Sequence, residues 1–255
     1  ARGKLTLKTP IPIVNRFRSI VDGSPYRLPV PRHPRDIPPR VIGQDLPVKT
    51  LIEEMITISS NLATNLLLQR VGPKNAMTTL RRLGLRGIEI LRGVQDLKAF
   101  DRGLSNRCTA RGMTRLYVRL ARGQVISKDA SKAMLDVLSR QRLHAKLPPL
   151  LPRAITLAHK GGTISTVSHD GGVASRHDRP EYVIVIMSQG YRRLAHVNRV
   201  LARMSRAIYR HVAKKRGWQR KHGALHRPRL RSRLRACMAL LCCLPASWGQ
   251  DIVDS

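Results

Sequence analysis

The stretch TLIEEMITISSNLATNLLLQRVG, residues 50–72, decides the fold of this chain of 255 residues. Apolar side chains recur along it at helical spacing. They are Leu51, Met55, Ile58, Leu62 and Leu66, with Ile52, Ile56, Ala63 and Leu67 beside them. A stripe that wide must be buried, so the sequence predicts core helices here. Thr50 and Glu53 have the spacing of a capping box, which predicts that the first helix begins at Thr50.

A polar corner interrupts this apolar stripe. Ser59, Ser60 and Asn61 are consecutive residues whose side chains compete with helical backbone hydrogen bonds. The sequence therefore predicts one helix that ends at Ile58, and a second that is capped by the corner and stops at Gly72. Taken alone, three cap-forming residues between helices indicate a structural turn far more often than a catalytic site.

The rest of the chain divides into a helical part and a part with strands. Residues 24–47 hold seven prolines, which predicts an extended loop. From Ile155 the apolar period changes from helical to two, and Gly171 and Gly172 are read as a hairpin turn. Further helices are expected at 74–83, 109–121, 127–140 and 194–212, and strands at 155–167, 173–175 and 182–187. We expect an α+β fold, with an antiparallel sheet flanked by helices and an all-α lobe.

The pattern predicts one folded domain over residues 1–215 and a basic, disordered tail over 216–255. Within the domain, we expect the all-α lobe at about 48–150 and the sheet with its C-terminal helix at about 153–215. The chain carries 48 Lys and Arg against 15 Asp and Glu, a net charge of +33, and no acid occurs between Tyr191 and Gln250. Such a field favours anionic partners, so the tail is expected to bind polyanions without specificity.

The cysteines predict neither a disulfide framework nor a metal site. One stands alone in the first half and three cluster near the end: Cys108, Cys237, Cys242 and Cys243. Four cysteines in a chain of this length leave the redox compartment open. His222 and His226 lie before the terminal cluster, but the spacing fits no common closed zinc site. The apolar run at 236–244 is too short to span a bilayer.

A second stretch with chemical potential lies in the first predicted strand. Lys160 is followed by Gly161, Gly162 and Thr163. Two glycines let a ligand approach the strand backbone closely, and the lysine beside them can hold a carboxylate. Alone, Gly-Gly in a strand more often marks a bulge. The run 168–170, Ser-His-Asp, has the residue types of a triad, but neighbours on a strand point to opposite faces, so the end of a hairpin is the better interpretation.

Together, the two stretches resemble the motifs of penicilloyl-serine hydrolases, whose set is S-x-x-K, S-D-N and K-T-G. The surrounding text strengthens the resemblance to class A β-lactamases over roughly residues 1–212. The similar segments are LIEEMITISSNLATNLLLQRVG, RGVQDLKAF, TARGMTRLYVRLARG and LAHKGGTISTVSHDGGV. The resemblance implies a serine hydrolase that opens β-lactam rings through an acyl-enzyme, and it implies no cofactor and no metal.

The resemblance also implies roles for individual residues. Ser59 is expected to relay a proton to the leaving nitrogen, and Asn61 to orient the substrate. Lys160 is expected to stabilise the substrate carboxylate electrostatically. Gly161, Gly162 and Thr163 are expected to line the substrate-binding strand.

This sequence departs from the family pattern at three points. No Ser or Thr stands three residues before a lysine, so the S-x-x-K nucleophile is not in these 255 residues. Gly161 replaces the Thr of K-T-G, and Thr163 is a partial replacement on the same side of the strand. Gln95 stands where the deacylating Glu is expected, and an amide cannot act as a general base. Asp96 is adjacent to it and is expected to point elsewhere.

The chain begins with Ala and shows no signal peptide, so it is read as the interior of a longer reading frame. In the family, the nucleophile lies on a central helix that would precede Ala1. We therefore expect Leu51, Ile56 and Leu67 to be short of packing partners.

The sequence predicts a serine β-lactamase-like protein that is inactive as given, with a β-lactam or peptidoglycan-like ligand. Alternatives are a D-Ala-D-Ala carboxypeptidase of the penicillin-binding type and a non-catalytic peptidoglycan-binding relative. A third alternative is a basic nucleic-acid-binding protein. Family resemblance implies a periplasmic or secreted location, and the sequence leaves the oligomeric state open.

Overall fold

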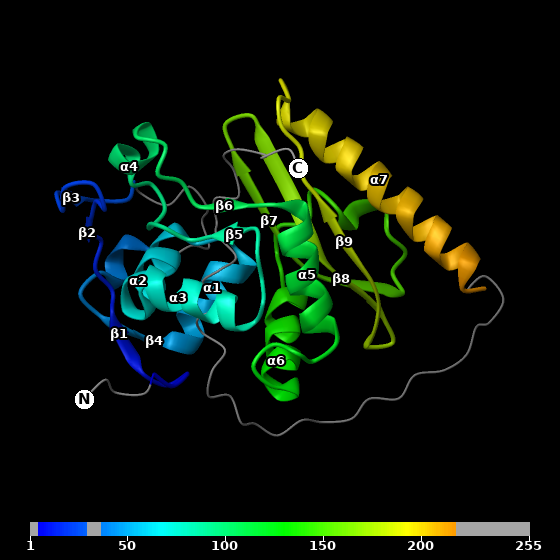
Figure 1. Ribbon diagram of the computed structural model, residues 1–255, viewed down its shortest axis with the longest axis horizontal. Helices are drawn as coiled ribbons and strands as arrows, with labels where there is room; N and C mark the ends of the chain where they lie inside the picture. The colour runs from blue at the N-terminus through cyan, green and yellow to red at the C-terminus, as the bar shows by residue number, and fades with distance from the viewer. Residues whose placement is uncertain (1–4, 30–36, 218–255) are drawn as a thin grey trace.

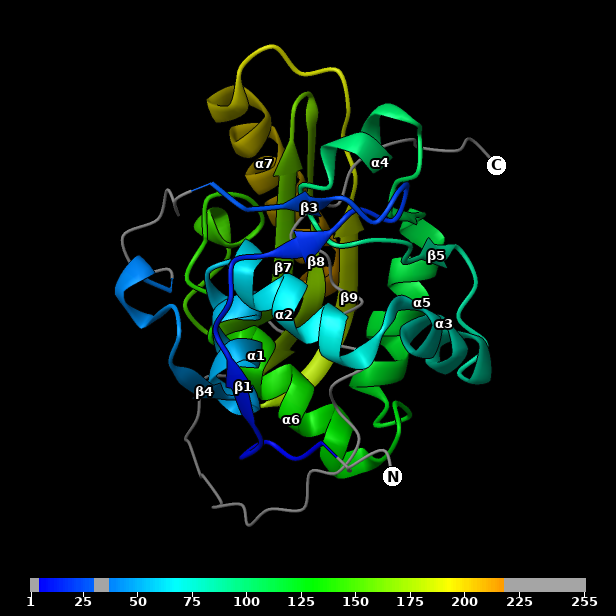
Figure 2. The same cartoon turned by 90° about the vertical axis from the view of Figure 1, so that its left-hand side faces the viewer.

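The computed structural model describes residues 5–29 and 37–217 of the chain. In this described part, a three-stranded antiparallel sheet has the order β7-β8-β9, with β7 at Ile155–Ile164, β8 at Val167–Arg176 and β9 at Arg179–Ile186. Helices α5 (Ala110–Ala121) and α6 (Lys128–Ser139) pack on one face, and α7 (Leu194–Lys215) packs on the other (Figures 1 and 2). The α+β fold with an antiparallel sheet flanked by helices is confirmed. The predicted tail lies, from residue 218 on, outside the described residues.

The remaining helices form a lobe beside the sheet: α1 (Val48–Thr57), α2 (Asn61–Val71), α3 (Pro73–Arg82) and the short α4 (Leu97–Asp101). Three two-stranded ribbons tie the loops together. They pair β1 (Pro10–Pro12) with β4 (Asp45–Pro47), β2 (Phe17–Arg18) with β3 (Pro25–Tyr26), and β5 (Ile88–Glu89) with β6 (Arg107–Cys108). Single 3-10 turns lie at Pro39–Val41 and Pro148–Leu150. No described helix is both long and apolar enough to cross a membrane.

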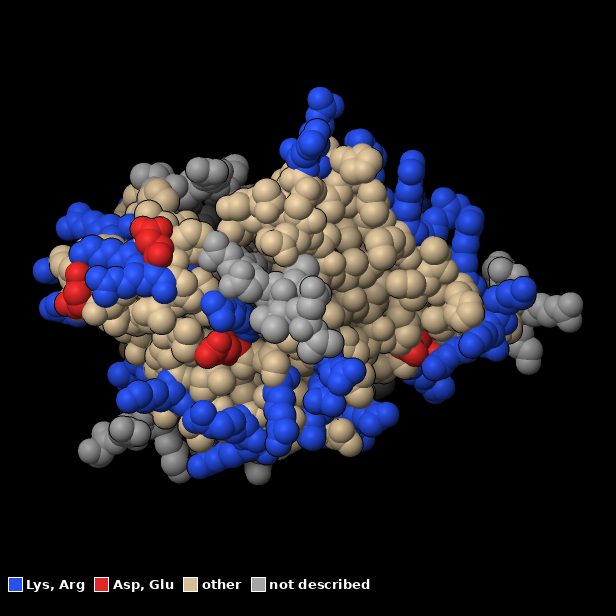
Figure 3. Space-filling view, turned by 45° about the horizontal axis from the view of Figure 1, so that its top comes forward, with Lys and Arg blue, Asp and Glu red and all other residues tan. Residues whose placement is uncertain are grey.

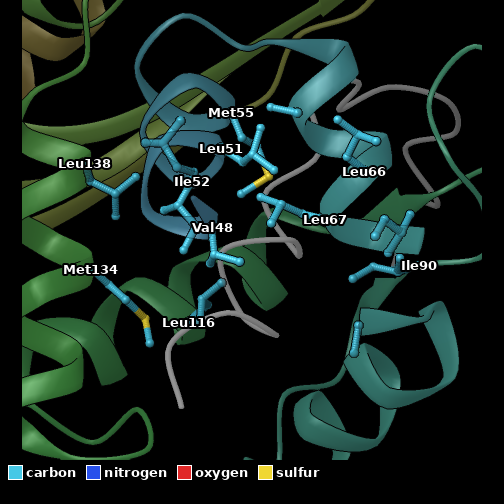
Figure 4. Packing of buried hydrophobic residues seen from close by; sticks show 14 of the residues in the cluster. Val48, Leu51, Ile52, Met55, Leu66, Leu67, Ile90, Leu116, Met134 and Leu138 are labelled. Carbon is cyan, nitrogen blue, oxygen red and sulfur yellow. The ribbon is translucent and has the colours of Figure 1, made fainter. Parts of the chain in front are cut away.

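One large core joins the helical lobe to the sheet (Figure 4). Leu51, Ile56 and Leu67 lie in this core and are each 0% exposed. The prediction that these side chains lack partners is therefore wrong. They share this core with side chains of α5 and α6, and α1 itself packs against α2 and α6. A smaller core between the sheet and α7 contains Leu157, Ile184 and Leu201.

The predicted start of the first helix is wrong by two residues. The helix begins at Val48, and no side chain caps it. The N–H of Val48 donates to the carbonyl of Thr9 (3.0 Å), and the N–H of Lys49 donates to that of Leu7 (3.0 Å). These bonds from a distant segment satisfy the first helical donors, so the capping box at Thr50 is not needed.

The reading of Gly171 and Gly172 as a hairpin turn is also wrong. Both lie inside β8, where Gly172 is paired with His159 of β7. A Cβ atom at residue 172 would lie 2.3 Å from the carbonyl oxygen of Ala158, so only glycine fits the close approach of the two strands. The turn between β8 and β9 contains His177 and Asp178, both with positive φ, as expected for a tight hairpin.

Candidate functional site

The polar corner between α1 and α2 meets strand β7. The ammonium Nζ of Lys160 donates to Oγ of Ser59 and to the carbonyl of Gly161 (2.6 Å). The Lys160 side chain is 0% exposed, whereas Ser59 is partly exposed. Residues 101 positions apart in the sequence are thus brought into direct contact.

Local capping explains why Ser59 is presented to the lysine. Oγ of Ser60 accepts from the N–H of Ala63 (3.2 Å) and caps α2, so its side chain is committed. The carbonyl of Glu54 accepts from Ser60 (3.1 Å), which closes the end of α1. Between these anchors Ser59 has φ of 59°, which is uncommon for a residue other than glycine and often marks a functional site. Asn61 is the first residue of α2 and is half-buried.

A second lysine, missed by the sequence analysis, lies beside the first. Nζ of Lys146 donates to the carbonyl of Gly162 (2.5 Å), to Oγ1 of Thr163 (2.9 Å) and to the carbonyl of His169 (2.9 Å). Lys146 belongs to the connection between α6 and β7, immediately before a proline-rich run. No periodicity or motif marks it in the sequence. It brings a second cation to the strand that carries Lys160.

Burial weakens the proton affinity of both amines. Desolvation, with a smaller contribution from the charge of Lys146, lowers the pKa of Lys160 to about 7. Desolvation also lowers the pKa of Lys146 to about 8. The carboxylate of Asp170 acts in the opposite direction on both lysines. At neutral pH, Lys160 is therefore only partly protonated, and its amine lies against the Ser59 hydroxyl.

The residues of the Ser-His-Asp run do not form a triad. Oδ1 of Asp170 lies 3.0 Å from Nδ1 of His159, and both side chains are buried. Nδ1 of His169 accepts from the N–H of Ser188 (3.0 Å). The imidazole of His169 is thus bonded to backbone, and Asp170 is bonded to a different histidine. The sequence-based interpretation of this run as the end of a hairpin agrees with its place at the start of β8, directly after the turn from β7.

The loop expected to carry the deacylating carboxylate is held by buried polar side chains. Asn65 of α2 accepts from the N–H of Val94 (2.7 Å) and donates to its carbonyl (3.0 Å). The carboxylate of Asp96 accepts from Oγ of Ser19 (2.8 Å) and from Ile20 N–H (2.9 Å). Asp96 also caps α4 through Ala99 N–H (3.2 Å) and is 1% exposed.

Asp96 therefore has a structural role in this loop, and Gln95 is the residue directly before it. Gln95 is half-buried and has a φ of 61°, so the loop turns sharply at this residue. Its side chain makes no hydrogen bond with another described residue. The assignment of Gln95 to the deacylating position stays a prediction.

The helical lobe, the edge strand with its lysine and the serine corner are the arrangement in which class A β-lactamases and penicillin-binding proteins carry their S-x-N and K-x-G motifs. The profile described as the beta-lactamase enzyme family matches residues 1–212, and the chain belongs to this family. No curated protein matches the sequence.

Solved structures share the fold at low identity. PBP-A is 23% identical, with a TM-score of 0.64, and the match covers 82% of this chain and 73% of that one. A beta-lactamase from Sphaerobacter thermophilus DSM 20745 is 22% identical with a TM-score of 0.61, covering 68% of this chain and 66% of that one. The TLA-3 extended-spectrum beta-lactamase is 18% identical with a TM-score of 0.62, covering 68% and 67%.

Proposed function

We propose that these 255 residues bind β-lactams, or peptidoglycan-like peptides, through their carboxylate and do not turn them over. The observation that carries this proposal is the pair of buried amines, Lys160 and Lys146. No carboxylate of a described residue lies within ion-pair distance of either amine. A buried ammonium group without a counter-ion is costly, and a ligand carboxylate would remove that cost.

The strand geometry supports a ligand laid along β7. This strand forms one edge of the described three-stranded sheet, and Gly161 and Gly162 add no side chains of their own beside the two amines. Thr163 adds a hydroxyl next to Lys146. Each charge-assisted hydrogen bond to the carboxylate would contribute about 1.5–3 kcal/mol. Asn61, at the start of α2, is proposed to hold the rest of the ligand.

Turnover needs an activated nucleophile, and the S-x-x-K pattern does not occur in these 255 residues. Gln95 would also leave an attacking water without a carboxylate to take its proton. We therefore assign Ser59 and Lys160 to binding and to proton relay. A ligand of this class implies a periplasmic or extracellular site of action, which is part of the proposal.

The test measures the equilibrium binding of benzylpenicillin by isothermal titration calorimetry. Intact-mass analysis and a nitrocefin hydrolysis assay are carried out on the same protein. We expect saturable binding, no covalent adduct and no hydrolysis. Affinity should fall as the pH rises through about 7–8, because the amines lose the protons that attract the carboxylate.

Substitutions locate the binding to the two amines. Lys160→Met and Lys146→Met should each weaken binding about tenfold or more, from the loss of one charge-assisted bond. Lys132→Met, at an exposed position on α6, is the matched control and should leave the affinity unchanged. Equal affinity in the control and both site variants, or a stoichiometric adduct on any serine, would contradict the proposal.

A further inference from the structure

Helix α7 leaves most of its surface uncovered. It lies across the outer face of the sheet, opposite α5 and α6 (Figure 1). Of its 22 residues, five are buried: Val197, Leu201, Ala202, Ser205 and Ala213. These residues define the face that packs on the sheet. The remaining residues face solvent wholly or in part.

A row of partly exposed apolar side chains runs along the border between this uncovered surface and the face that packs on the sheet. Val200 is 37% exposed, Met204 is 44% exposed and Ile208 is 36% exposed. The spacing of four residues places the three side chains one above the other on the helix. Leu194, in the first turn of α7, is also a large exposed apolar side chain. Single exposed apolar residues are ordinary, but a continuous row on one helix indicates a contact surface.

Basic side chains cover the rest of the outer surface. They are Arg199, Arg203, Arg206, Arg210, Lys214 and Lys215, and all six are exposed. The helix contains no acid. Near the C-terminal end of α7, Arg216 forms an ion pair with Glu181 of β9 (2.6 Å). Lys and Arg line the edge of the molecule where α7 lies (Figure 3).

We propose that the outer surface of α7 docks on a lipid bilayer that contains anionic headgroups. The helix would lie in the plane of the interface, with Val200 and Met204 entering the headgroup region and the arginines contacting phosphates. A basic amphipathic helix with an apolar row has the composition of an interfacial helix. Basic residues near such a surface each add to the attraction.

The charge and the apolar row together select the bilayer over other occupants. A nucleic acid would use the arginines but would gain little from the apolar row, because its phosphate backbone is polar. A second copy of the chain would bring the same positive surface against α7 and be repelled. The segment that follows the helix contains no acid as far as Gln250, so it offers no complementary charge. The proposal is independent of the ligand proposed to bind along β7.

The test reports on position 204 itself, because the basic tail can also bind vesicles. The full chain carries serine at the three terminal cysteines and a single introduced thiol, Met204→Cys, labelled with the polarity-sensitive dye NBD. Burial raises the pKa of Cys108 to about 12, so its thiol stays unlabelled at neutral pH. The matched control carries Lys132→Cys on α6, on the other side of the sheet.

The probes are vesicles of phosphatidylcholine, the same vesicles with added phosphatidylglycerol, and a DNA duplex. We expect the label at position 204 to brighten and shift to the blue only with phosphatidylglycerol, and the label at 132 not to respond. Arg203→Gln with Arg206→Gln should lower the vesicle partition coefficient about 30-fold. Val200→Ser with Met204→Ser should lower it about tenfold. Circular dichroism checks that each variant is folded.

Three results would overturn the proposal. The first is a silent label at position 204 on vesicles that still sediment the protein, which would place the contact elsewhere in the chain. The second is a response to DNA without a response to vesicles. The third is a blue shift that depends on protein concentration without lipid, which would indicate a second copy.

Discussion

The buried amine of Lys160 should make the folded chain more stable as the pH rises from about 7 to 9, and Lys160→Met should remove this effect. The physical reason is linkage between protonation and folding. Burial lowers the pKa of Lys160 from 10.5 to about 7 in the folded chain. Between these values the unfolded chain holds the proton and the folded chain has released it. The free energy of unfolding therefore increases with pH over this window.

The size of the effect follows from the shift. One pKa unit corresponds to about 1.4 kcal/mol. Between about pH 7 and 9 the folded amine is mostly deprotonated while the unfolded amine keeps its proton. Lys160 therefore adds about 2 kcal/mol to the free energy of unfolding over this interval. Lys146, with its pKa lowered to about 8, contributes in the same direction at the upper end. Cys108 acts oppositely, because its pKa is raised from 9.0 to about 12 and its effect begins near pH 9. The comparison should therefore stop at about pH 9.

The measurement is urea unfolding of the wild-type chain and Lys160→Met at pH values from about 6.5 to 9, with the free energy extrapolated to water. The difference between the two proteins isolates Lys160, because other titrating groups are common to both. Lys132→Met is the control and should keep the wild-type pH dependence, since an exposed amine is solvated in both states. Parallel pH dependence of the wild type and Lys160→Met would show that the amine is not desolvated as the structure has it.

Two further predictions concern ligand binding along β7 and the loop that carries Gln95 and Asp96. Gly161→Thr should improve penicillin binding more in a Lys146→Met background than in the wild type, because the Thr side chain and the Lys146 ammonium compete for the same space. A double-mutant cycle measured by calorimetry tests this, and equal gains in affinity in the two backgrounds would refute it. Asp96→Asn should lower the free energy of unfolding by about 1–3 kcal/mol, because the Asp96 carboxylate holds Ser19, Ile20 and α4, whereas Gln95→Glu should change it little. Urea unfolding checks both loop variants, and an unaltered stability of Asp96→Asn would contradict the structural role.

Local signals predicted the elements that local hydrogen bonds determine. Thr109 and Ser127, the first residues of two predicted helices, cap α5 and α6 with side chains that accept from Gly112 N–H (3.0 Å) and Ala130 N–H (3.1 Å). The start of α1 was missed because its first donors bond to residues 7 and 9, far away in the sequence. Gly171 and Gly172 were misread for a similar reason. A Gly-Gly pair is equally typical of a turn and of closely approaching strands, and only the pairing partner distinguishes the two.

The candidate site was predictable only in part. Family motifs linked Ser59 to Lys160, although periodicity alone could not have brought together residues that lie on different elements. The burial of Leu51, Ile56 and Leu67 was mispredicted because packing partners come from α5 and α6, whose placement the sequence pattern does not give. Lys146 was missed because it lies in an irregular connection, where neither helical nor strand periodicity marks an inward side chain.

The glycine that breaks the family motif and the lysine that the sequence analysis missed are two parts of one feature. A Cβ atom at Gly161 would lie 3.4 Å from Nζ of Lys146 and 3.3 Å from the carbonyl oxygen of His169. The absence of a side chain at residue 161 therefore leaves the space in which the Lys146 ammonium bonds to Gly162 and Thr163. A Thr hydroxyl at position 161 would offer a ligand one neutral hydrogen bond, whereas the ammonium offers a charge-assisted one. Replacing the Thr hydroxyl by the Lys146 ammonium should make the affinity for an anion along β7 depend more steeply on pH and on salt concentration, since the charge is present only while the amine is protonated.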